Sequence, residues 1–467
     1  MSNLFLWIFL LTILYSILFY GKTLGLSVIL FVPLVLMFVI YVLKKYNKIQ
    51  NKKGLLFIIP ILLLSLTYFI YDNAFFYESN FMVIFGLFIL IYIYTIKPTF
   101  ILSKIINDAA RIIFEPLTCI SKIFNLLGGK ISKKVHLSEK HKKIIKSIII
   151  ILPIVCVVLA LLSSADMMFD ELLSKGFSNV GKVLERYFSE DLLGRLITMF
   201  IFFIYMSASL NFIIFNYKEE KEVFKEKKEK DPFTIHLLLT VLNIIYIIFD
   251  FIQIRSLLFH YVSSSVNYAE YARQGFFQLM FVSMINITVI LIAKRFEREN
   301  SKYIKIQSII MVFLTFIIVI SSFLRMHLYE SMYGYTFLRL LVYTILIGET
   351  VLFIPTILYI LKSKFNILKY YMIIILIFYV SLNYLNPNVF IAKRNIQRYE
   401  KTGKIDICYL ENFDSDSVLE LYHLYKNTND KEIKNSLKNY FNSIDLNMNG
   451  ISEYNLSKMK AKRVLRK

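Results

Sequence analysis

The amino-acid sequence predicts an all-α fold: a polytopic helical transmembrane bundle of about eleven spans with a small C-terminal helical module. Two observations carry this prediction. Apolar residues make up 57% of the 467 residues and charged residues only 19%, whereas soluble domains are about 45–50% apolar and about 25% charged. The apolar residues also gather in runs long enough to cross about 30 Å of hydrocarbon as a helix. An ordinary soluble fold is therefore excluded.

The spans follow from the apolar runs taken in chain order. The first run lacks the basic start and small-residue cleavage site of a signal peptide, so we expect it to be retained. The predicted spans are 4–20, 24–43, 54–71, 81–96, 144–163, 192–215, 233–259, 275–293, 304–324, 337–361 and 367–385.

The loops predict the orientation of the chain. The loop 44–53, KKYNKIQNKK, carries five lysines and no acid, which places it in the cytoplasm by the positive-inside rule. Alternation then makes the basic loops 97–143, 216–232, 294–303 and 362–366 cytoplasmic and leaves the loops 72–80 and 164–191 outside. The N-terminus is predicted to be cytoplasmic and the C-terminal module extracytoplasmic.

Three segments are not spans. Residues 101–127 alternate isoleucines with charges at helical spacing, which predicts an amphipathic helix in the cytoplasmic interface. Residues 218–231 mix acids and bases, as a solvated helix does, and residues 386–467 are polar. The predicted organisation is a four-span region (1–96), an interfacial segment (97–143), a seven-span core (144–385) and a helical C-terminal module (386–467).

The net charge of +21 does not predict nucleic-acid binding, because the lysines lie mostly in short loops between spans. The three cysteines, Cys119, Cys156 and Cys408, are far apart, so neither a disulfide framework nor a cysteine-based metal site is predicted. The expected partner is the lipid bilayer, with an anionic lipid or an envelope component on the outer side. The sequence does not predict an oligomeric state.

Ionisable side chains in or beside the spans are the candidate functional residues. A charge inside the bilayer costs a few kcal/mol or more and usually faces the bundle interior or a cavity. Glu349 lies near the middle of the tenth span, and Arg325 and Glu330 lie in the predicted outer loop RMHLYESMYGYT. The residues predicted to line an outward-facing polar cavity are Asp250, Arg255, Glu270, Arg273, Arg325, Glu330, Arg339 and Glu349.

Two interpretations of these charges stay open. In the first they anchor helices at the membrane boundary, with Arg273 paired to Glu270 at the i,i+3 spacing. In the second they line a cavity for an anionic or phosphate-bearing ligand. Glu349 is either part of a proton or cation relay or a structural partner of Arg255 or of a tyrosine hydroxyl.

No sequence motif predicts a metal, a cofactor or catalysis. His260 and His327 lack the spacing of metal ligands, and no catalytic motif of a hydrolase, kinase or zinc protease occurs. The segment 445–450, DLNMNG, matches the first half of a calcium loop. The position that needs a bidentate glutamate is Leu456, so we predict a helix-capping turn there instead.

Five separated segments resemble one family of bacterial membrane proteins, grouped as domain of unknown function 4173 and kin to the 4153 group. The resemblance starts near residue 150 and reaches the C-terminus, and it implies a polytopic protein of the bacterial plasma membrane without an established activity. The segments are LLSSADMMFDELL (161–173), YAEYARQGFFQLMFVSMINI (268–287), RMHLYESMYGYTFLRL (325–340), NPNVFIAKRNIQRYEKTGKIDICYLENFDSDSV (386–418) and YNLSKMKAKRVL (454–465).

Three classes of function remain open. The first is a carrier with charged residues around a midplane site, which helices broken near Gly348 or Pro355 would support. The second is an envelope sensor or assembly partner without catalysis. The third is an intramembrane transferase acting on a lipid-linked phosphate, with Arg273, Arg325 and Arg339 holding phosphate and Glu270 or Glu330 as the base. A carrier is the preferred interpretation, and an enzyme is not expected.

Overall fold

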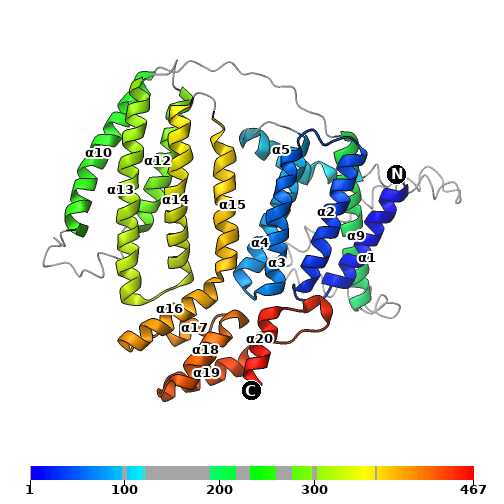
Figure 1. Cartoon of the computed structure of the whole chain (residues 1–467). Coiled ribbons are helices and arrows are strands. Elements are labelled where there is room, and N and C mark those ends of the chain that lie inside the picture. The colour runs from blue at the N-terminus through cyan, green and yellow to red at the C-terminus, as the bar shows by residue number, and fades with distance from the viewer. Residues whose placement is uncertain are drawn as a thin grey trace, which may run out of the picture. The chain divides into compact units, whose positions relative to one another are not determined.

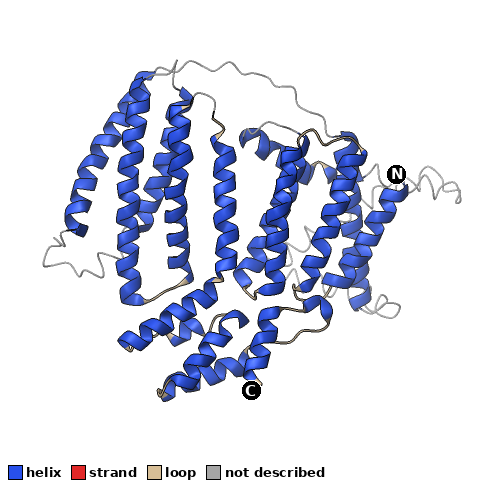
Figure 2. Cartoon of the chain, in the orientation of Figure 1, coloured by secondary structure: helices blue, strands red, loops and turns tan. Residues whose placement is uncertain are grey.

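The computed structural model describes residues 2–96, 102–117, 119–120, 190–216, 232–258, 276–296, 302–362 and 365–466. Within these ranges all regular secondary structure is helical, as Figure 2 shows. This confirms the predicted all-α class.

Nine helices of the described ranges are long and apolar enough to cross a membrane. A tenth apolar helical stretch, Leu4–Phe19, is shorter. These ten coincide with ten of the eleven predicted spans. The remaining predicted span, 144–163, lies outside the described residues, as do the segment 218–231 and most of the loop 164–191. A multi-pass membrane protein is therefore confirmed.

The chain divides into two compact units. Unit 1 comprises Met1–Ile58, Phe85–Lys221 and Asn449–Glu453, and unit 2 comprises Ile59–Ile84, Glu222–Met448 and Tyr454–Lys467. Helix α4 (Ala74–Ile96) contributes its first part to unit 2 and the rest to unit 1. The other helices of unit 1 are α1 (Ser2–Phe19), α2 (Leu26–Lys45), η1 (Lys52–Phe57), α5 (Leu102–Phe114), α9 (Glu190–Asn211), η2 (Phe212–Asn216) and η4 (Ile451–Glu453).

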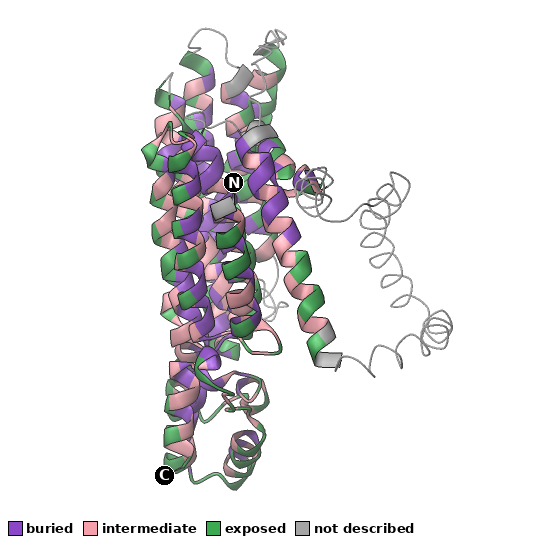
Figure 3. Ribbon diagram, turned by 90° about the vertical axis from the view of Figure 1, so that its right-hand side faces the viewer, coloured by how far each residue is buried: buried purple, intermediate pink, exposed green. Residues whose placement is uncertain are grey.

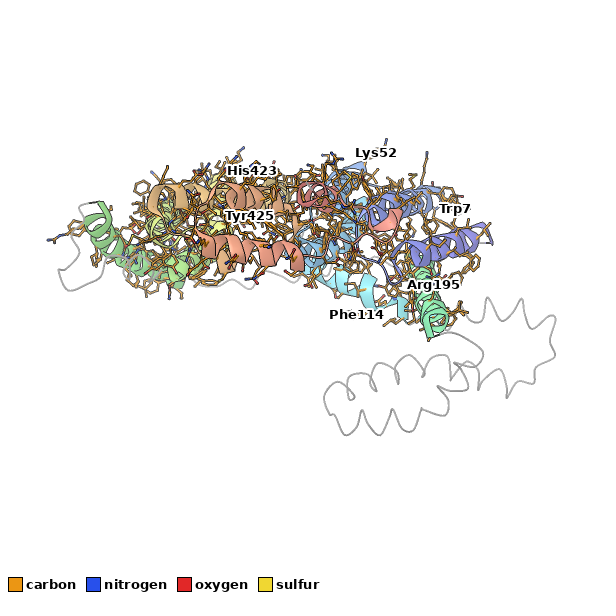
Figure 4. All side chains as sticks on the ribbon, turned by 90° about the horizontal axis from the view of Figure 1, so that it is seen from below. Trp7, Lys52, Phe114, Arg195, His423 and Tyr425 are labelled. Atoms are coloured by element: carbon orange, nitrogen blue, oxygen red, sulfur yellow. The ribbon has the colours of Figure 1, made fainter. Side chains whose placement is uncertain are left out.

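Unit 1 is held by apolar packing between α1, α2 and α9. Its core contains Leu4, Ile8 and Leu11 of α1 and Leu210 of α9. Arg195 of α9, labelled in Figure 4, stacks its guanidinium over the Tyr20 ring at 5.3 Å. In α5, a salt bridge joins Arg111 Nε to Glu115 Oε1 at 2.8 Å.

Helix α5 has the amphipathic character predicted for residues 101–127. Ile105 and Ile112 are buried, whereas Ile106 and Phe114 are exposed. Phe114 stands at the end of the helix and is labelled in Figure 4. A helix with one apolar face and one charged face suits a membrane interface, so an interfacial position stays the expectation.

Unit 2 contains the candidate site. Four helices form its centre: α10 (Pro232–Leu258), α12 (Phe276–Phe296), α13 (Lys302–Tyr333) and α14 (Phe337–Leu361). Of these, α13 makes the most extensive contacts with the other three. Figure 1 shows α16 (Pro387–Thr402) to α19 (Lys431–Ser443) below the lower ends of α13, α14 and α15 (Ile367–Leu385). The helices of unit 2 besides α4 are α3 (Ile58–Ile70), the central α10 (Pro232–Leu258), α12 (Phe276–Phe296), α13 (Lys302–Tyr333) and α14 (Phe337–Leu361), then α15 (Ile367–Leu385), α16 (Pro387–Thr402), α17 (Ile407–Leu410), η3 (Ser415–Ser417), α18 (Val418–Asn427), α19 (Lys431–Ser443) and α20 (Leu456–Leu465).

The C-terminal helices have their own apolar core, which packs partly on the membrane helices of unit 2. Val418 and Leu421 of α18 and Leu437 of α19 are fully buried in it. The labels His423 and Tyr425 in Figure 4 mark the exposed and the half-buried face of α18, and Tyr425 packs edge-on against Phe441 of α19. Short polar helices were predicted for residues 386–467, and the structure has them.

Two predicted loops are wrong in extent. The loop 72–80 is mostly helix, because the Asn73 side chain accepts a hydrogen bond from the Phe76 N–H and begins α4 at Ala74. The loop predicted after residue 324 is also helix, since α13 continues to Tyr333 and ends before Gly334, whose φ is +82°. Arg325, His327 and Glu330 therefore lie on helical turns.

Candidate functional site

Helix α10 carries a polar stripe on an otherwise apolar surface. His236, Asn243, Tyr246, Asp250 and Gln253 follow one another at intervals of three, four or seven residues, which places them on one face of a helix. Asn243, Asp250 and Gln253 are buried, while the remainder of the helix exposes large apolar side chains. Figure 3 shows buried, intermediate and exposed residues alternating along the helices that face the viewer.

The stripe is joined to α12 and α13 by hydrogen bonds. The Tyr246 hydroxyl donates to Asn286 Oδ1 at 2.7 Å, and Asn286 Nδ2 donates to Thr315 Oγ1 at 3.0 Å. Nearer the start of α10, Asn243 Nδ2 donates to the Gln307 carbonyl at 3.1 Å, and His236 Nδ1 lies 3.1 Å from Gln307 Oε1. Polar side chains thus link three spans at successive depths.

Glu349 lies inside this bundle, on α14. Its side chain is buried, with 3% of its surface exposed. One carboxylate oxygen, Oε2, accepts a hydrogen bond from the Ser283 hydroxyl of α12 at 2.6 Å. The other oxygen, Oε1, is buried and has no hydrogen-bond partner in the part of the chain that the structure describes. The hydroxyl bonded to Glu349 is therefore that of a serine, whereas the structural interpretation expected Arg255 or a tyrosine hydroxyl in that place.

Asp250 is the second buried carboxylate of the bundle. It is also 3% exposed, and neither of its carboxylate oxygens has a hydrogen-bond partner in the described part of the chain. A carboxylate at such depth without a cationic partner is stable only when it takes up a proton or meets a cation.

Arg325 and Arg255 occupy different environments. Arg325 is buried on α13, and its Nη2 donates to Gln253 Oε1 at 2.8 Å. The same Gln253 oxygen accepts a hydrogen bond from Ser321 at 2.8 Å. Arg255 is exposed near the end of α10. Arg325 therefore joins α13 to the polar stripe of α10.

Glu330 and Arg339 lie where α13 turns into α14. Buried Glu330 accepts a hydrogen bond from the Tyr343 hydroxyl at 3.4 Å and lies 3.5 Å from His327 Nδ1. Arg339 donates to the Gly334 carbonyl and lies over the Tyr329 ring at 4.3 Å. This end of the bundle is thus tied together by its own charged side chains.

The structure brings six of the eight predicted site residues into the four-helix bundle of unit 2: Asp250, Arg255, Arg325, Glu330, Arg339 and Glu349. They lie at different positions along α10, α13 and α14. Glu270 and Arg273 lie outside the described residues. Convergence of all eight on a single cavity therefore stays a prediction.

Several buried polar residues that form hydrogen bonds inside the bundle were not predicted from the sequence. Ser283 and Asn286 of α12 are three residues apart and both fully buried, and Thr315 of α13 is buried as well. Their signal was the helical spacing of small polar residues within apolar runs. A prediction based on charged residues alone does not include these small polar residues.

The hint of a broken helix near Glu349 is wrong. Helix α14 runs from Phe337 to Leu361 through both Gly348 and Pro355. A Cβ added at Gly348 would meet the Phe378 ring at an ordinary contact distance of 3.9 Å. The site is built from continuous helices.

The segment 445–450 forms a turn. The Asp445 side chain accepts a hydrogen bond from the Asn447 N–H at 3.0 Å. The Asn455 side chain caps α20 by accepting from the N–H groups of Ser457 and Lys458, and Leu456 is the first residue of that helix. In the described ranges no group of three or more His, Cys, Asp or Glu side chains could hold a metal ion.

Comparison with known proteins gives one match. A family model described as Domain of unknown function (DUF4153) matches residues 58–424. No curated protein and no solved structure matches the chain. The match starts well before residue 150, where the resemblance was expected to start, and ends before the last helix. It is to the group named above as kin, and membership of the 4173 family itself stays a prediction. Because the matched residues cover most of its length, the chain belongs to the DUF4153 family.

Proposed function

We propose that this integral membrane protein is a proton-coupled carrier whose bundle of α10, α12, α13 and α14 moves protons through Glu349 and Asp250. The observation that carries the proposal is the pair of membrane-embedded carboxylates with unpartnered oxygens in one bundle. Each could accept a proton from one side and release it to the other, since neither forms an ion pair with a described residue.

The hydrogen-bonded side chains between the carboxylates and the bundle ends support the same proposal. Hydroxyl and amide groups such as Ser283, Tyr246 and Asn286 can pass or orient protons when water reaches them. The alternatives of a phosphate cradle or a sensing module gain less, because Arg325 and Arg339 already donate to Gln253 and to the Gly334 carbonyl.

Proton flux in proteoliposomes tests the proposal. Glu349→Gln and Asp250→Asn keep side-chain shape but cannot ionise, so each should lower pH-gradient-driven flux about tenfold or more. Glu432→Gln, on the exposed surface of α19, is the matched control and should leave flux unchanged. Size-exclusion profiles equal to the wild type would show that the variants fold. Wild-type flux in both bundle variants would refute the relay and leave the carboxylates a packing role.

We also propose that the protein lies in the bacterial plasma membrane with a cytoplasmic N-terminus and its C-terminal module outside. Cys408 offers a native reporter because its thiol is exposed and free, whereas that of Cys119 is buried. With Cys119 and Cys156 replaced by Ser, a membrane-impermeant maleimide should label Cys408 in intact cells. A further Cys408→Ser replacement should remove the label. Labelling that requires broken cells would place the module in the cytoplasm.

A further inference from the structure

A second polar cluster lies in unit 2 where the C-terminal module meets the turn between α3 and α4. Asp416 Oδ1 accepts a hydrogen bond from the Asp72 N–H at 2.9 Å, and Asp414 Oδ2 accepts one from the Ala74 N–H at 2.9 Å. In return, the Ser415 N–H donates to Asp72 Oδ2 at 3.4 Å. The segment NFDSDSV (412–418) is the end of the family-like segment 386–418. Its hydrogen bonds therefore attach the C-terminal module to the α3–α4 turn.

Asn455, just before α20, ties a second part of the module to the same turn. Its Nδ2 donates to the carbonyls of Tyr68 and Tyr71 at 3.0 and 2.7 Å, while its Oδ1 caps α20. The Tyr77 hydroxyl donates to Asp72 Oδ1 at 3.1 Å. Both the segment 414–417 and Asn455 thus satisfy backbone groups left free at the helix ends.

Beside this junction is a small pocket with room for about one water molecule. It is enclosed by the ends of α3 and α15, the start of α4 and Asp416 of the module. In Figure 1 the lower ends of α3, α4 and α15 lie together, and Asn80 of α4 joins them by donating to Thr67 and to Asn383. Eight of the ten residues that line the pocket carry a side-chain oxygen, among them Thr67, Tyr77, Asn73, Asn383, Asn386 and Asp416, although most of the surface facing the pocket is apolar.

Two of the lining residues each have a side-chain oxygen without a hydrogen-bond partner among the residues that the structure describes. Asp416 is 7% exposed, and its Oδ2 is buried without a hydrogen bond. The side-chain oxygen of Asn386, Oδ1, is likewise buried without one. No Lys, Arg or His lines the pocket, and Asp72 and Asp414 add negative charge nearby. Buried acceptors of this kind, one of them on a carboxylate that has two further carboxylates nearby, favour a positive ligand.

We propose that this pocket binds one monovalent cation of about the size of sodium, with Asp416 Oδ2 and Asn386 Oδ1 as direct ligands. The volume fits one small ion without a hydration shell, and amide and carboxylate oxygens are the ligands that hard cations prefer. A single lining carboxylate balances one positive charge. Calcium takes six to eight oxygens and several carboxylates, which this pocket does not supply.

Proton binding at Asp416 competes with the cation. Burial raises the pKa of Asp416 to about 7, and the charges of Asp72 and Asp414 act in the same direction. The Ser457 hydroxyl and the Asp72 N–H act in the opposite direction. Burial also raises the pKa of Asp414, against the attraction of Lys458. Cation binding is therefore stronger above the pKa of Asp416 than below it.

Equilibrium dialysis of the detergent-purified full-length protein with radioactive sodium tests the site. The buffer holds choline as the other cation and a pH above the pKa of Asp416. We expect about one sodium bound per chain, and a rise in the thermal unfolding midpoint when sodium replaces choline. Asp416→Asn should abolish both effects, and Asn386→Ala should weaken binding about tenfold or more. Asp414→Asn changes a carboxylate of the cluster that does not line the pocket, and it should retain sodium.

Each other outcome would overturn the proposal. Equal sodium uptake by the wild type and Asp416→Asn would place the ion elsewhere. Stabilisation by acid with no sodium effect at any pH would make the pocket a proton or water site only. Because Asp416 and Asn386 take no part in the proposed proton path, loss of sodium binding with intact proton flux would leave the proposed function standing.

Discussion

Replacing Gly334 with Ala at the turn between α13 and α14 is expected to destabilise the protein by about 3 kcal/mol or more. Its φ of +82° is a conformation that an L side chain pays about 1–2 kcal/mol to adopt. An added Cβ would also stand 2.5 Å from Asn395 Oδ1. The Asn395 side chain cannot move away from the added Cβ without losing hydrogen bonds. Its Oδ1 accepts from the Tyr335 N–H at 2.9 Å, and its Nδ2 donates to the Tyr335 carbonyl at 2.8 Å.

Thermal unfolding of the purified variants in detergent separates the two contributions. Gly403→Ala is the matched control, since Gly403 also has a positive φ of +69° but nothing within 4 Å of an added Cβ. It should cost only about 1 kcal/mol. If both variants melt at the same temperature, the contact with Asn395 contributes nothing and α16 is not held by this turn.

In sodium-free buffer the docking of the C-terminal module is expected to weaken as the pH rises from about 4 to about 7. The pKa of Asp416 is about 7 in the folded protein against an ordinary value of 3.8, because burial disfavours the charged carboxylate. The folded state therefore binds the proton more tightly than the unfolded state. Its stabilising effect is complete below the ordinary pKa and is lost as the pH rises through about 7. The whole effect is on the order of 3–4 kcal/mol at most.

Cysteine protection measures this dependence directly. Val418 is fully buried in the core of the module, so Val418→Cys in a background without Cys119, Cys156 and Cys408 reports each opening by reacting with maleimide. After correction for thiol ionisation, the labelling rate should rise over this pH range. Asp416→Asn keeps the Oδ1 acceptor for the Asp72 N–H and should flatten the profile. A wild-type labelling rate that falls with rising pH would contradict the expected loss of docking stability above the pKa of Asp416.

Much of the fold could be predicted from local sequence. Ten predicted spans were found as helices, and α5 has the amphipathic faces that its isoleucine spacing indicates. Helix ends were predicted less well. The extension of α13 through Arg325 and Glu330 and the early start of α4 depend on Gly334 and on the Asn73 cap, and composition alone carries neither signal strongly.

The candidate site was predicted in its charged members and not in its connections. Glu349 stood out because a carboxylate in mid-span is expensive. Its partner Ser283 is one of many small polar residues in apolar runs, and only the packing of α12 against α14 selects it. Asp416 gave no signal of burial in the sequence, since it lies in the polar segment DSDS.

By itself the sequence determined that this chain is an all-α, multi-pass membrane protein, because hydrophobic length and helical spacing are properties of neighbouring residues. The tertiary structure alone decided which polar groups meet. Asp416 reaches the α3–α4 turn across 344 positions of the chain, and Ser283 reaches Glu349 across 66. Such pairs depend on how whole helices pack. The local sequence around a serine or an aspartate is the same whether or not the fold brings a hydrogen-bond partner to it.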